Sequence, residues 1–599
     1  MKVSDYIVSF FEKFGIKDVF MISGGLAMHL NDSFGKSKKI RYYCNFHEQA
    51  SAMAAEGYAR YNNNLAVCVV TGGPGGSNCV TGVVGQWQDS VPVLYLSGQV
   101  KQELLCEKGM RQLGEQELSI IPIISSITKY AVQITDPKTI RYHLEKAVYL
   151  ALSGRPGPVW LDIPLDIQAA EINEKEIVGY EREAVLSDSK ADIEEKIKKS
   201  IEYLKESKRP VILVGRGARI ANALDAVHRI SRKYTIPVLP AWCSNDTVYK
   251  TFPNYFGNPG LTCDRAANFI IQNADVVLSL GSRLNLKTVS FNYKTFAREA
   301  ILIAVDIDKY ELSKKTIHPD IAIWANVKDV VDPLEKYMHG FAANKWYPWK
   351  ETCRQWKKRY DKHLPAYQKK GNVYVNPYHF VSAFSEESKN IKSIVSCNSV
   401  AAVSSLLMID LWKGQRFIIN SGCGAMGYDL PAAIGVTIAS GRKDTALFVG
   451  DGSIMFNIQE LQTIAYYKLP IKIFIFNNKG YLSIRNTQKT FFGGHIVAAD
   501  KNSGVACPDF KKIAKAFALP YFEIRNHKKM NAAIRNILQK KGPVICDLHM
   551  SYDLELIPRV VSKMFSDGKM YSLPMEDLYP FLDREEFRKN MLIKPILYE

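Results

Sequence analysis

Short, strongly apolar runs recur along the chain and alternate with longer segments in which apolar residues return every three or four positions. The short runs are typical of strands buried on both faces, and the longer segments of amphipathic helices. The strand-like runs are 65–73, 91–99, 155–164, 209–217, 274–283, 300–308, 391–399, 444–453, 471–478 and 542–549. Strands that alternate with helices form parallel sheets covered on both faces. We therefore predict an α/β protein.

The runs fall into three groups, which predict three consecutive doubly wound α/β domains and a C-terminal tail. The expected segments are 1–170, 190–340, 370–550 and, for the tail, 551–599. A charged stretch over 171–209 is expected to be a solvated linker and helix. The tail carries apolar residues and should dock on the rest of the chain, and a lid over an active site is one role that it could have.

Composition limits the class of protein. The 599 residues are 47% hydrophobic and 23% charged, which is typical of globular proteins. No run of about 18 apolar residues predicts a membrane span, and Asp5 and Glu12 interrupt the apolar N-terminus, which predicts an amphipathic helix instead of a signal peptide. The 11 cysteines form no CxxC pairs, so we expect reduced thiols and a cytoplasmic protein.

The net charge of +18 is spread along the chain without a basic block. This distribution favours an anionic small substrate over a nucleic-acid partner. We therefore expect small-molecule partners, and neither a nucleic acid nor a membrane.

Two polar motifs follow neighbouring strand-like runs. The run 444–453 ends in Gly-Asp-Gly-Ser, and the run 471–478 ends in Asn-Asn. Parallel strands deliver such residues to one edge of a sheet, where Asp451, the Asn478 amide and the Gly480 carbonyl would offer oxygen ligands to Mg²⁺. Glycines and free N–H groups of the following helix suit a phosphate. A plain turn with a capping Asp451 is the alternative, and the pairing of both motifs favours a magnesium-diphosphate clamp.

These motifs resemble the signature of thiamine-diphosphate enzymes. Asn478 follows Asp451 by 27 positions, which matches the spacing of that signature. The resemblance implies thiamine diphosphate and Mg²⁺ as cofactors, with Asp451, Asn478 and Gly480 as metal ligands. The stretch 45-NFHEQASAMAAEGYAR-60 resembles the family's glutamate motif, so Glu48 would hydrogen-bond the cofactor's pyrimidine ring. Without the resemblance, Glu48 would be interpreted as an N-terminal helix cap.

Further stretches resemble acetolactate synthase and its relatives, in the same order to about residue 550. They are 23–25, 71–100, 154–164, 305–308 and 421–435. The resemblance implies a pyrimidine-binding, a central and a diphosphate-binding domain. It also implies an active site between two chains, and hence a homodimer or homotetramer.

The resemblance assigns roles to single residues. Met426 would wedge the cofactor into a bent shape, Gly424 would accept a hydrogen bond from it, and Gln116 would be a pocket glutamine; a core filler and a solvated helix residue are the alternatives for Met426 and Gln116. The expected cofactor-binding residues are Gly24, Gly25, Glu48, Pro74, Asn78, Gly424, Met426, Gly450, Asp451, Gly452, Ser453, Asn478, Gly480, Tyr481 and Leu482.

The chain departs from acetolactate synthases at two positions. Arg485 stands where a tryptophan shapes the acceptor site, and Glu115 stands where a phenylalanine is expected. Arginine offers a charged, planar fork for a carboxylate or phosphate. We therefore expect an acceptor other than pyruvate or 2-oxobutyrate, with Glu48, Gln116 and Arg485 as catalytic residues.

The expected activity is a thiamine-diphosphate- and Mg²⁺-dependent decarboxylase or carboligase. It would decarboxylate a 2-oxo acid, with pyruvate as the expected donor, and transfer the two-carbon unit to a carbonyl acceptor such as an anionic or nucleotide-linked keto sugar. A genuine acetolactate synthase and a simple 2-oxo acid decarboxylase are the alternatives. FAD stays open, because the chain has 215-GRG-217 and 281-GSR-283 but lacks the usual Met-His-Gly loop near 257–268.

Overall fold

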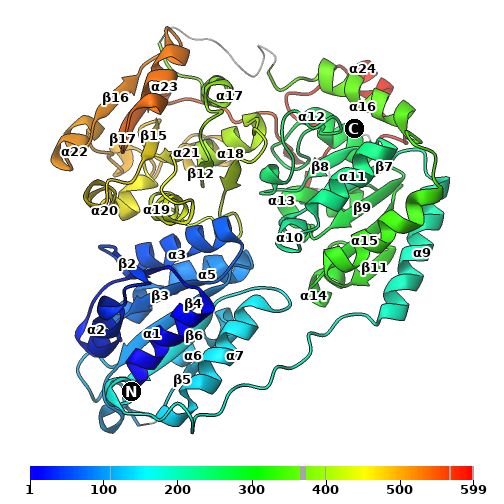
Figure 1. The fold of residues 1–599 in the computed structure, drawn as a ribbon. Helices are drawn as coiled ribbons and strands as arrows, with labels where there is room; N and C mark the ends of the chain where they lie inside the picture. Colours follow the sequence, from blue (N-terminus) through cyan, green and yellow to red (C-terminus); the bar gives the residue numbers. More distant parts are fainter. Residues whose placement is uncertain (108, 364–372, 398, 565–567, 597–599) are drawn as a thin grey trace.

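The computed structural model describes residues 1–107, 109–363, 373–397, 399–564 and 568–596. Within these residues the chain forms three parallel sheets and one two-stranded antiparallel sheet. Figure 1 shows three sheet-and-helix parts in sequence order, coloured blue, green and yellow-orange. The predicted α/β class with three consecutive doubly wound layers is confirmed. Residue 398 of the predicted run 391–399 lies outside the described residues, as do the first residues of the predicted third domain and the last three of the tail.

The first sheet has six strands in the order β2-β1-β3-β4-β6-β5. Helices cover both of its faces, because Val67 and Val69 of β3 point into one buried cluster and Cys68 and Val70 into another. Its strands are β1 (Asp18–Met21), β2 (Arg41–Cys44), β3 (Ala66–Val70), β4 (Val93–Gln99), β5 (Tyr130–Gln133) and β6 (Val159–Pro164). Its helices are α1 (Val3–Phe14), α2 (Met28–Lys36), α3 (Glu48–Asn62), α4 (Pro74–Asn78), α5 (Val80–Gln88), α6 (Ile120–Ile124), α7 (Ile140–Leu152) and α8 (Leu165–Ala169).

The central sheet has five strands in the order β11-β10-β9-β7-β8. Its strands are β7 (Pro210–Val214), β8 (Val238–Pro240), β9 (Val276–Leu280), β10 (Ile301–Asp306) and β11 (Ile321–Trp324). Its helices are α9 (Lys190–Glu206), α10 (Arg216–Ile220), α11 (Leu224–Tyr234), α12 (Arg265–Gln272), α13 (Leu286–Val289), α14 (Lys309–Leu312), α15 (Val327–Tyr337) and α16 (Tyr347–Arg359).

The third sheet has six strands in the order β13-β12-β14-β15-β17-β16. Its strands are β12 (Ser393–Ser396), β13 (Arg416–Ile418), β14 (Thr445–Gly450), β15 (Ile471–Asn477), β16 (Tyr521–Ile524) and β17 (Val544–His549). Its helices are α17 (Pro377–Glu387), α18 (Ser399–Met408), α19 (Asp429–Ala439), α20 (Glu460–Tyr466), α21 (Leu482–Phe491), α22 (Phe510–Ala516) and α23 (Met530–Gln539).

The three sheets have the same strand order over their first four strands. Numbered within each part, the first and third sheets both have the order 2-1-3-4-6-5, and the central sheet has 2-1-3-4-5. In each, the chain reverses direction across the sheet between its first and third strands. Open parallel sheets bind ligands beyond the carboxyl ends of their strands at such a switch point. The fold therefore offers three candidate positions for a ligand.

Two predicted helices differ in the structure. The N-terminal helix ends at Gly15, which has a left-handed φ of 94°, and β1 follows it. After the Gly-Asp-Gly turn, the structure has the 3₁₀ helix η8 (Ile454–Asn457) before the seven-residue α20. A long α-helix does not begin directly at the predicted phosphate turn, so any backbone N–H groups offered there belong to the turn and η8.

The first and third parts pack on one another through α3 and α19, which face each other in Figure 1. A Cβ on Gly57 would lie 2.3 Å from the carbonyl oxygen of Ala432, and one on Gly435 would lie 1.8 Å from that of Ala54. Only glycine therefore permits this close approach of two helix backbones. The contact joins the two parts that carry the predicted cofactor motifs into one buried cluster.

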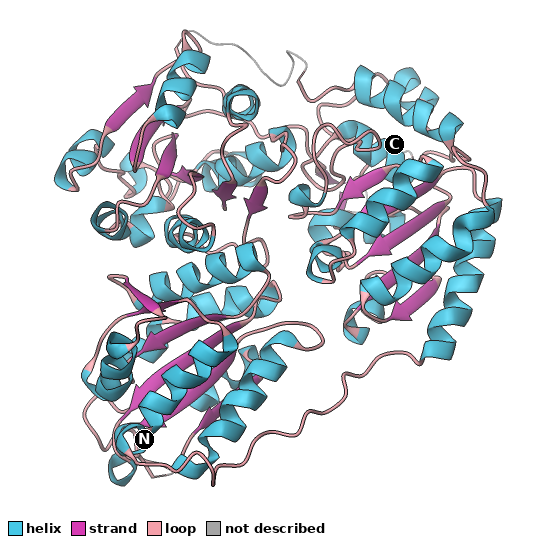
Figure 2. Ribbon diagram, viewed as in Figure 1, coloured by secondary structure: helices cyan, strands magenta, loops and turns pink. Residues whose placement is uncertain are grey.

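The tail leaves β17 and crosses to the central part, in orange to red in Figure 1, and Figure 2 shows the long loop that connects the first part to the central part before α9. It forms the hairpin of β18 (Ser562–Met564) and β19 (Met570–Ser572) and the helix α24 (Arg584–Lys589). Met575 and Phe587 are fully buried in the central core. Part of the tail thus packs in the core of the central part, and its role as a lid stays a prediction. No helix among the described residues is long and apolar enough to cross a membrane.

Candidate active site

The loops after β1 and β3 meet at the switch point of the first sheet. A Cβ on Gly24 would lie 2.4 Å from Cβ of Thr71, and one on Gly75 would lie 2.8 Å from Cγ2 of the same threonine. Pro74 begins α4, whereas a Cβ on Gly25 would meet no described atom within 4 Å. The structure therefore brings these predicted residues to one edge, and Gly25 leaves space there.

Glu48 is the first residue of α3 and is half-buried at the same edge. Its Oε2 accepts a hydrogen bond of 3.0 Å from Nδ2 of Asn78. No side-chain hydrogen bond caps the N-terminus of α3 at His47, but Glu48 lies in the first turn of the helix, where a carboxylate is favourable, so both interpretations of Glu48 stay open. The contact joins two residues that the sequence assigned to the cofactor separately.

Gln116 lies in a turn after β4 and is exposed. Its backbone has a left-handed φ of 57°, and a Cβ on Gly73 would lie 2.2 Å from its carbonyl oxygen. The turn therefore packs directly against the Gly-Gly-Pro loop after β3. The alternative that Gln116 is a solvated helix residue is wrong about the helix, and its role toward a substrate stays a prediction.

Asp162, at the end of β6, is a buried residue that the sequence did not single out. It accepts hydrogen bonds from Ser97 at 2.5 Å, Gln133 at 2.9 Å and Gln99 at 3.2 Å. Gln99 also donates to the carbonyl of Leu118 at 2.9 Å, and this links the network to the turn that carries Gln116. Burial raises the pKa of Asp162 to about 6, although the three donors lower it.

The Gly-Asp-Gly and Asn-Asn-Lys-Gly loops lie beside each other, after the adjacent strands β14 and β15. The Asp451 carboxylate accepts from the N–H of Gly452 at 2.8 Å and from that of Gly480 at 3.0 Å. Asn477 turns away and donates to Asp547 at 3.2 Å. The structure thus brings Asp451 and the loop of Asn478 and Gly480 together, as the spacing predicted, and their role as ligands stays a prediction.

The electrostatics of Asp451 fit a cation. The side chain is only 1% exposed, and burial raises its pKa to about 6 against the effect of backbone N–H donors and, to a smaller extent, of the charge of Arg485. Among the described residues, no Lys, Arg or His forms an ion pair with it, and no cluster of three or more His, Cys, Asp or Glu could hold a metal. Amide and backbone oxygens would therefore have to complete a Mg²⁺ site around this carboxylate.

Met426 and Tyr481 converge on the Gly-Asp-Gly turn. A Cβ on Gly452 would lie 2.3 Å from the Tyr481 ring and 3.6 Å from Cε of Met426. Ser453 donates to Asp429 at 2.6 Å and accepts from the N–H of Gly427 at 3.0 Å. Its hydroxyl therefore holds the loop 419–428 between β13 and α19, which carries Met426 and is called the methionine loop below. Gly424 has a left-handed φ of 61°, Gly450 ends β14, and Leu482 packs into the core of the third part.

Arg485 is not at the surface. Its side chain is 0% exposed, and its guanidinium donates to backbone carbonyls and to Asn478. An acceptor could reach this group only if those bonds opened. Binding of an acceptor by Arg485 stays a prediction, and its contacts are taken up below.

A buried network of the first part holds the methionine loop, and the sequence did not reveal it. Asp89 accepts from the N–H groups of Ser421 and Gly422 at 3.1 Å each, and from Arg60 at 2.6 Å. Asn420 donates to Glu56 at 3.0 Å and accepts from the N–H of Gly424 at 3.2 Å. Burial alone would raise the pKa of Asp89, but Arg60 and the N–H donors hold it below its ordinary value.

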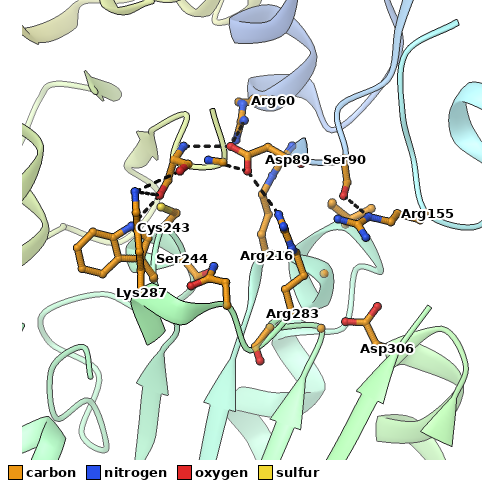
Figure 3. Close-up of a pocket in the computed structure, with 18 of the residues that line it drawn as sticks. Arg60, Asp89, Ser90, Arg155, Arg216, Cys243, Ser244, Arg283, Lys287 and Asp306 are labelled. Carbon is orange, nitrogen blue, oxygen red and sulfur yellow. Dashed lines mark hydrogen bonds and ion pairs between the residues drawn. The ribbon is translucent and has the colours of Figure 1, made fainter. Parts of the chain in front are cut away.

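A cavity of about 270 Å³ opens at the switch point of the central sheet (Figure 3). Arg216 donates to the carbonyl of Asp89 at 2.9 Å, and among the described residues no carboxylate lies within ion-pair distance of it. Burial and the neighbouring Arg60 lower the pKa of Arg216 to about 9. The cavity's charged lining is Arg60, Asp89, Arg155, Arg216, Arg283, Lys287 and Asp306.

One side of this cavity is closed toward the methionine loop. Nε1 of Trp242 donates to Oγ of Ser421 at 2.8 Å, and Nζ of Lys287 donates to the Ser421 carbonyl at 3.2 Å. Arg155 and Arg283 are paired with Glu311 at 2.9 and 3.0 Å. Arg216 and Lys287 are therefore the cations of this cavity that have no ion-pair partner among the described residues.

Comparison with known families identifies three domains in the chain. Models of the thiamine pyrophosphate enzymes match the chain in three segments: the N-terminal TPP binding domain at residues 1–119, the central domain at 197–334 and the C-terminal TPP binding domain at 397–548. The chain belongs to the thiamine pyrophosphate enzyme family.

Its relatives within that family include acetolactate synthases. The chain is 31% identical to the acetolactate synthase large subunit of Cyanidium caldarium, over 90% of this chain and 92% of the relative. It is 28% identical to acetolactate synthase 1, chloroplastic, of Zea mays, over 94% and 87%. It is also 28% identical to the acetolactate synthase isozyme 1 large subunit of Escherichia coli (strain K12), over 93% and 95%. The chain is therefore an acetolactate synthase-like enzyme that uses thiamine diphosphate.

Proposed function

We propose that this protein is a thiamine-diphosphate- and Mg²⁺-dependent carboligase. It would decarboxylate a 2-oxo acid, with pyruvate as the expected donor, and transfer the two-carbon unit to a carbonyl acceptor. The observation that carries the proposal is the buried Asp451 carboxylate, which accepts hydrogen bonds from backbone N–H groups and forms no ion pair among the described residues, although Arg485 acts on it at longer range, in a chain of this family. Thiamine diphosphate supplies the electron sink for decarboxylation, and the protein supplies position and electrostatics.

In this proposal the edge of the third sheet binds the metal and the diphosphate, and the edge of the first sheet binds the pyrimidine ring. At the third sheet, Asp451, the Asn478 amide and the Gly480 carbonyl would hold Mg²⁺, and the Gly450–Ser453 turn would bind the diphosphate. At the first sheet, Glu48, whose carboxylate accepts from Asn78 at 3.0 Å, would exchange a proton with the pyrimidine ring of the bound cofactor. Gln116 lies exposed at the rim, where it would orient the donor.

The acceptor in this proposal is an anionic carbonyl compound, and a nucleotide-linked keto sugar is the form we favour. The apolar wall that the resemblance predicts at residue 485 is missing, because an arginine occupies that position and faces the interior. Lys479, on the loop between Asn478 and Gly480, is exposed and is the nearest basic group along the chain that could meet an acceptor's anion. The net charge of +18 also favours anionic substrates.

We further propose that two chains form each site, in a homodimer or homotetramer. Large apolar side chains are exposed near both candidate edges, among them Phe46 at 62%, Phe456 at 52% and Phe492 at 65%. Exposed apolar groups of this size usually belong to an interface. The relatives named as large subunits are themselves parts of assemblies.

Binding of a flavin in the central cavity is an open part of the proposal. The charge of Arg216 suits a diphosphate, whereas the Gly215 and Gly281 loops pack on each other, since a Cβ on Gly215 would lie 2.0 Å from the Gly281 carbonyl. The volume of about 270 Å³ is below the roughly 300–1,000 Å³ of pockets that take drug-sized ligands. The visible absorption spectrum of the purified protein, before and after added FAD, decides whether a flavin binds.

The first experiment is reconstitution with thiamine diphosphate and Mg²⁺, followed by pyruvate alone and then by pyruvate with a panel of keto acids, sugar phosphates and nucleotide-linked keto sugars. Products are identified by mass spectrometry. We expect slow turnover of pyruvate alone and a joined product with an anionic acceptor. No product with any acceptor of the panel would remove the proposed acceptor class.

The same experiment tests the alternatives. The acetolactate synthase relatives favour acetolactate as the product, and its formation from pyruvate alone at about 1 per second or faster would identify a genuine acetolactate synthase. Free acetaldehyde as the main product would identify a simple decarboxylase, which is a lyase and not a transferase.

A further inference from the structure

The guanidinium of Arg485 in α21 lies at the centre of a buried set of hydrogen bonds. Nη1 donates to the carbonyl of Ala499 at 3.2 Å. Nη2 donates to the Asn478 carbonyl at 3.0 Å, to Oδ1 of Asn478 at 3.3 Å and to the Tyr552 carbonyl at 3.1 Å. The planar group also lies over the Tyr552 ring, 4.1 Å from its centroid. Such a group is not available to a ligand, because exposing it would break several charge-assisted hydrogen bonds.

Its partners carry the expected metal ligands. Asn478 is contacted directly, through both its carbonyl and its side-chain amide oxygen. The Ala499 carbonyl that Arg485 holds also accepts from the N–H of Tyr481 at 2.8 Å, and a Cβ on Gly480 would lie 2.4 Å from it. One side chain therefore fixes both ends of the Asn478–Tyr481 loop.

The same guanidinium connects this loop to the beginning of the C-terminal tail. The hydroxyl of Tyr552 donates to Asp500, and the Asp500 carboxylate in turn accepts from the N–H of Ser503 at 2.9 Å in the short helix η9 (Lys501–Ser503). The Asn478–Tyr481 loop, the turn at 499–503 and the first residues of the tail thus form one assembly around Arg485.

We propose that Arg485 is a positioning residue for the metal ligands and does not bind the acceptor. The inference rests on the proposed function, since it requires Mg²⁺ at Asp451 and Asn478. An amide oxygen has two lone pairs, so Oδ1 of Asn478 can accept from Arg485 and still face a cation. Mg²⁺ demands a nearly ideal octahedron, and a loop without its anchor would present these oxygens less often in the required geometry. Lysine, as a point charge, cannot span the same carbonyls.

The test compares Arg485→Lys and Arg485→Met with the wild type, without substrate. The measured quantity is the Mg²⁺ concentration for half-maximal binding of thiamine diphosphate, followed by the quenching of intrinsic tryptophan fluorescence. We expect both variants to raise it tenfold or more, since hydrogen bonds to a charged group are lost. At saturating Mg²⁺, KM for the acceptor should stay within about twofold of the wild type, whose KM is measured alongside.

A different pattern would overturn the inference. If Arg485 binds the acceptor, Arg485→Met raises KM for the acceptor, Arg485→Lys largely preserves it, and neither variant changes the Mg²⁺ requirement. A wild type that binds no thiamine diphosphate with Mg²⁺ would remove the proposed function and this role with it, and is recognised before any variant is measured.

Two further variants serve as a control and as an independent test. Lys511→Met changes an exposed lysine of α22 whose described contacts do not include Arg485, Asn478 or Tyr552, so it should leave the Mg²⁺ requirement unchanged. Tyr552→Leu keeps the arginine but removes the ring beside it and the hydroxyl that donates to Asp500; it should raise the requirement by about twofold or more, since a cation–π contact and a hydrogen bond are lost. If the Arg485 variants do not fold, an unchanged requirement in Tyr552→Leu overturns the proposal.

Discussion

At the scale of single residues, Glu48 offers the most direct test of the proposed mechanism. Its carboxylate is fixed by Asn78 and is remote in sequence from the predicted metal ligands. Glu48→Gln keeps the shape and the amide contact but removes the exchangeable proton. We expect turnover to fall by about 10²–10⁴, while the Mg²⁺-dependent binding of thiamine diphosphate stays within a few-fold of the wild type.

Steady-state product formation and fluorescence quenching measure the two effects of Glu48→Gln separately. Glu103→Gln, at an exposed glutamate of the same part of the chain, is the control and should change neither. Unchanged turnover in Glu48→Gln would exclude Glu48 from the mechanism.

Asp162 predicts a pH dependence of stability. Burial raises its pKa to about 6 in the folded protein, against about 3.9 in an unfolded chain. The folded state therefore binds more protons between about pH 4 and 6, so stability from this group is present below pH 4 and is lost as pH rises through 6. The difference between these two pKa values corresponds to about 3 kcal/mol.

Asp162→Asn should remove this dependence. The difference in thermal midpoint between wild type and variant, measured at pH 4.5 and at pH 7.5, should shift in favour of the variant at the higher pH. A difference that is equal at both values would show that Asp162 does not titrate in this window.

The sequence located some of these residues and not others, for physical reasons. Asp451 and Asn478 could be found because each directly follows an apolar run, and adjacent parallel strands end at one edge. The contact of Arg485 with Tyr552 joins residues 67 positions apart, and that of Asp89 with Ser421 joins residues 332 apart. Such partners depend on the docking of whole segments, about which the local pattern contains no information.

At the scale of elements, the predicted strands are those that the structure buries deepest. All ten predicted runs contain strands of the sheet interiors: β3, β4, β6, β7, β9, β10, β12, β14, β15 and β17. The edge strands β2, β5, β8, β11, β13 and β16 were not predicted. Edge strands here have three or four residues, and most are partly exposed, so they lack a continuous apolar run. The interior strand β1 was missed because the helical pattern before it continued into its sequence.

The crossing of α3 and α19 predicts that two chemically equal substitutions will have opposite effects. Gly435→Ala would place a methyl group 1.8 Å from the Ala54 carbonyl, whereas Gly35→Ala, in α2, would meet nothing within 4 Å. Alanine improves helix propensity at both sites by at most about 1 kcal/mol, but overpacking costs typically 1–3 kcal/mol or more.

We therefore expect a lower thermal midpoint for Gly435→Ala, by about 2–4 °C per kcal/mol, and an equal or higher one for Gly35→Ala. Scanning calorimetry of both variants checks this. Equal behaviour of the two would mean that α3 and α19 do not cross as closely as Gly57 and Gly435 indicate.

At the scale of the whole molecule, the tail connects the third part to the central part. Phe587 is fully buried in the central core, and Glu576 pairs with Arg298 at 2.7 Å while buried. Phe587→Ala should cost about 3–5 kcal/mol and lower the thermal midpoint, while KM for the substrates stays near that of the wild type. Phe581→Ala, at a partly exposed phenylalanine of the same tail, is the control. A large change in KM with little loss of stability would favour a lid.

The proposed assembly makes the last prediction. Glu48 belongs to the edge of the first sheet and Asp451 to that of the third, and the described hydrogen bonds of Glu48 stay within its own part of the chain. If each site takes Glu48 from one chain and Asp451 from another, Glu48→Gln and Asp451→Asn should each inactivate the enzyme alone but complement each other when co-expressed.

The expected size of this effect follows from counting sites. Random pairing makes half of the dimers mixed, and each mixed dimer has one site with both residues intact, so about a quarter of the wild-type activity should return by the stoichiometry of a shared-site dimer. Affinity purification through different tags on the two chains isolates the mixed dimers and should raise the value to about half. A mixed dimer with no activity would place Glu48 and Asp451 of one chain in the same site.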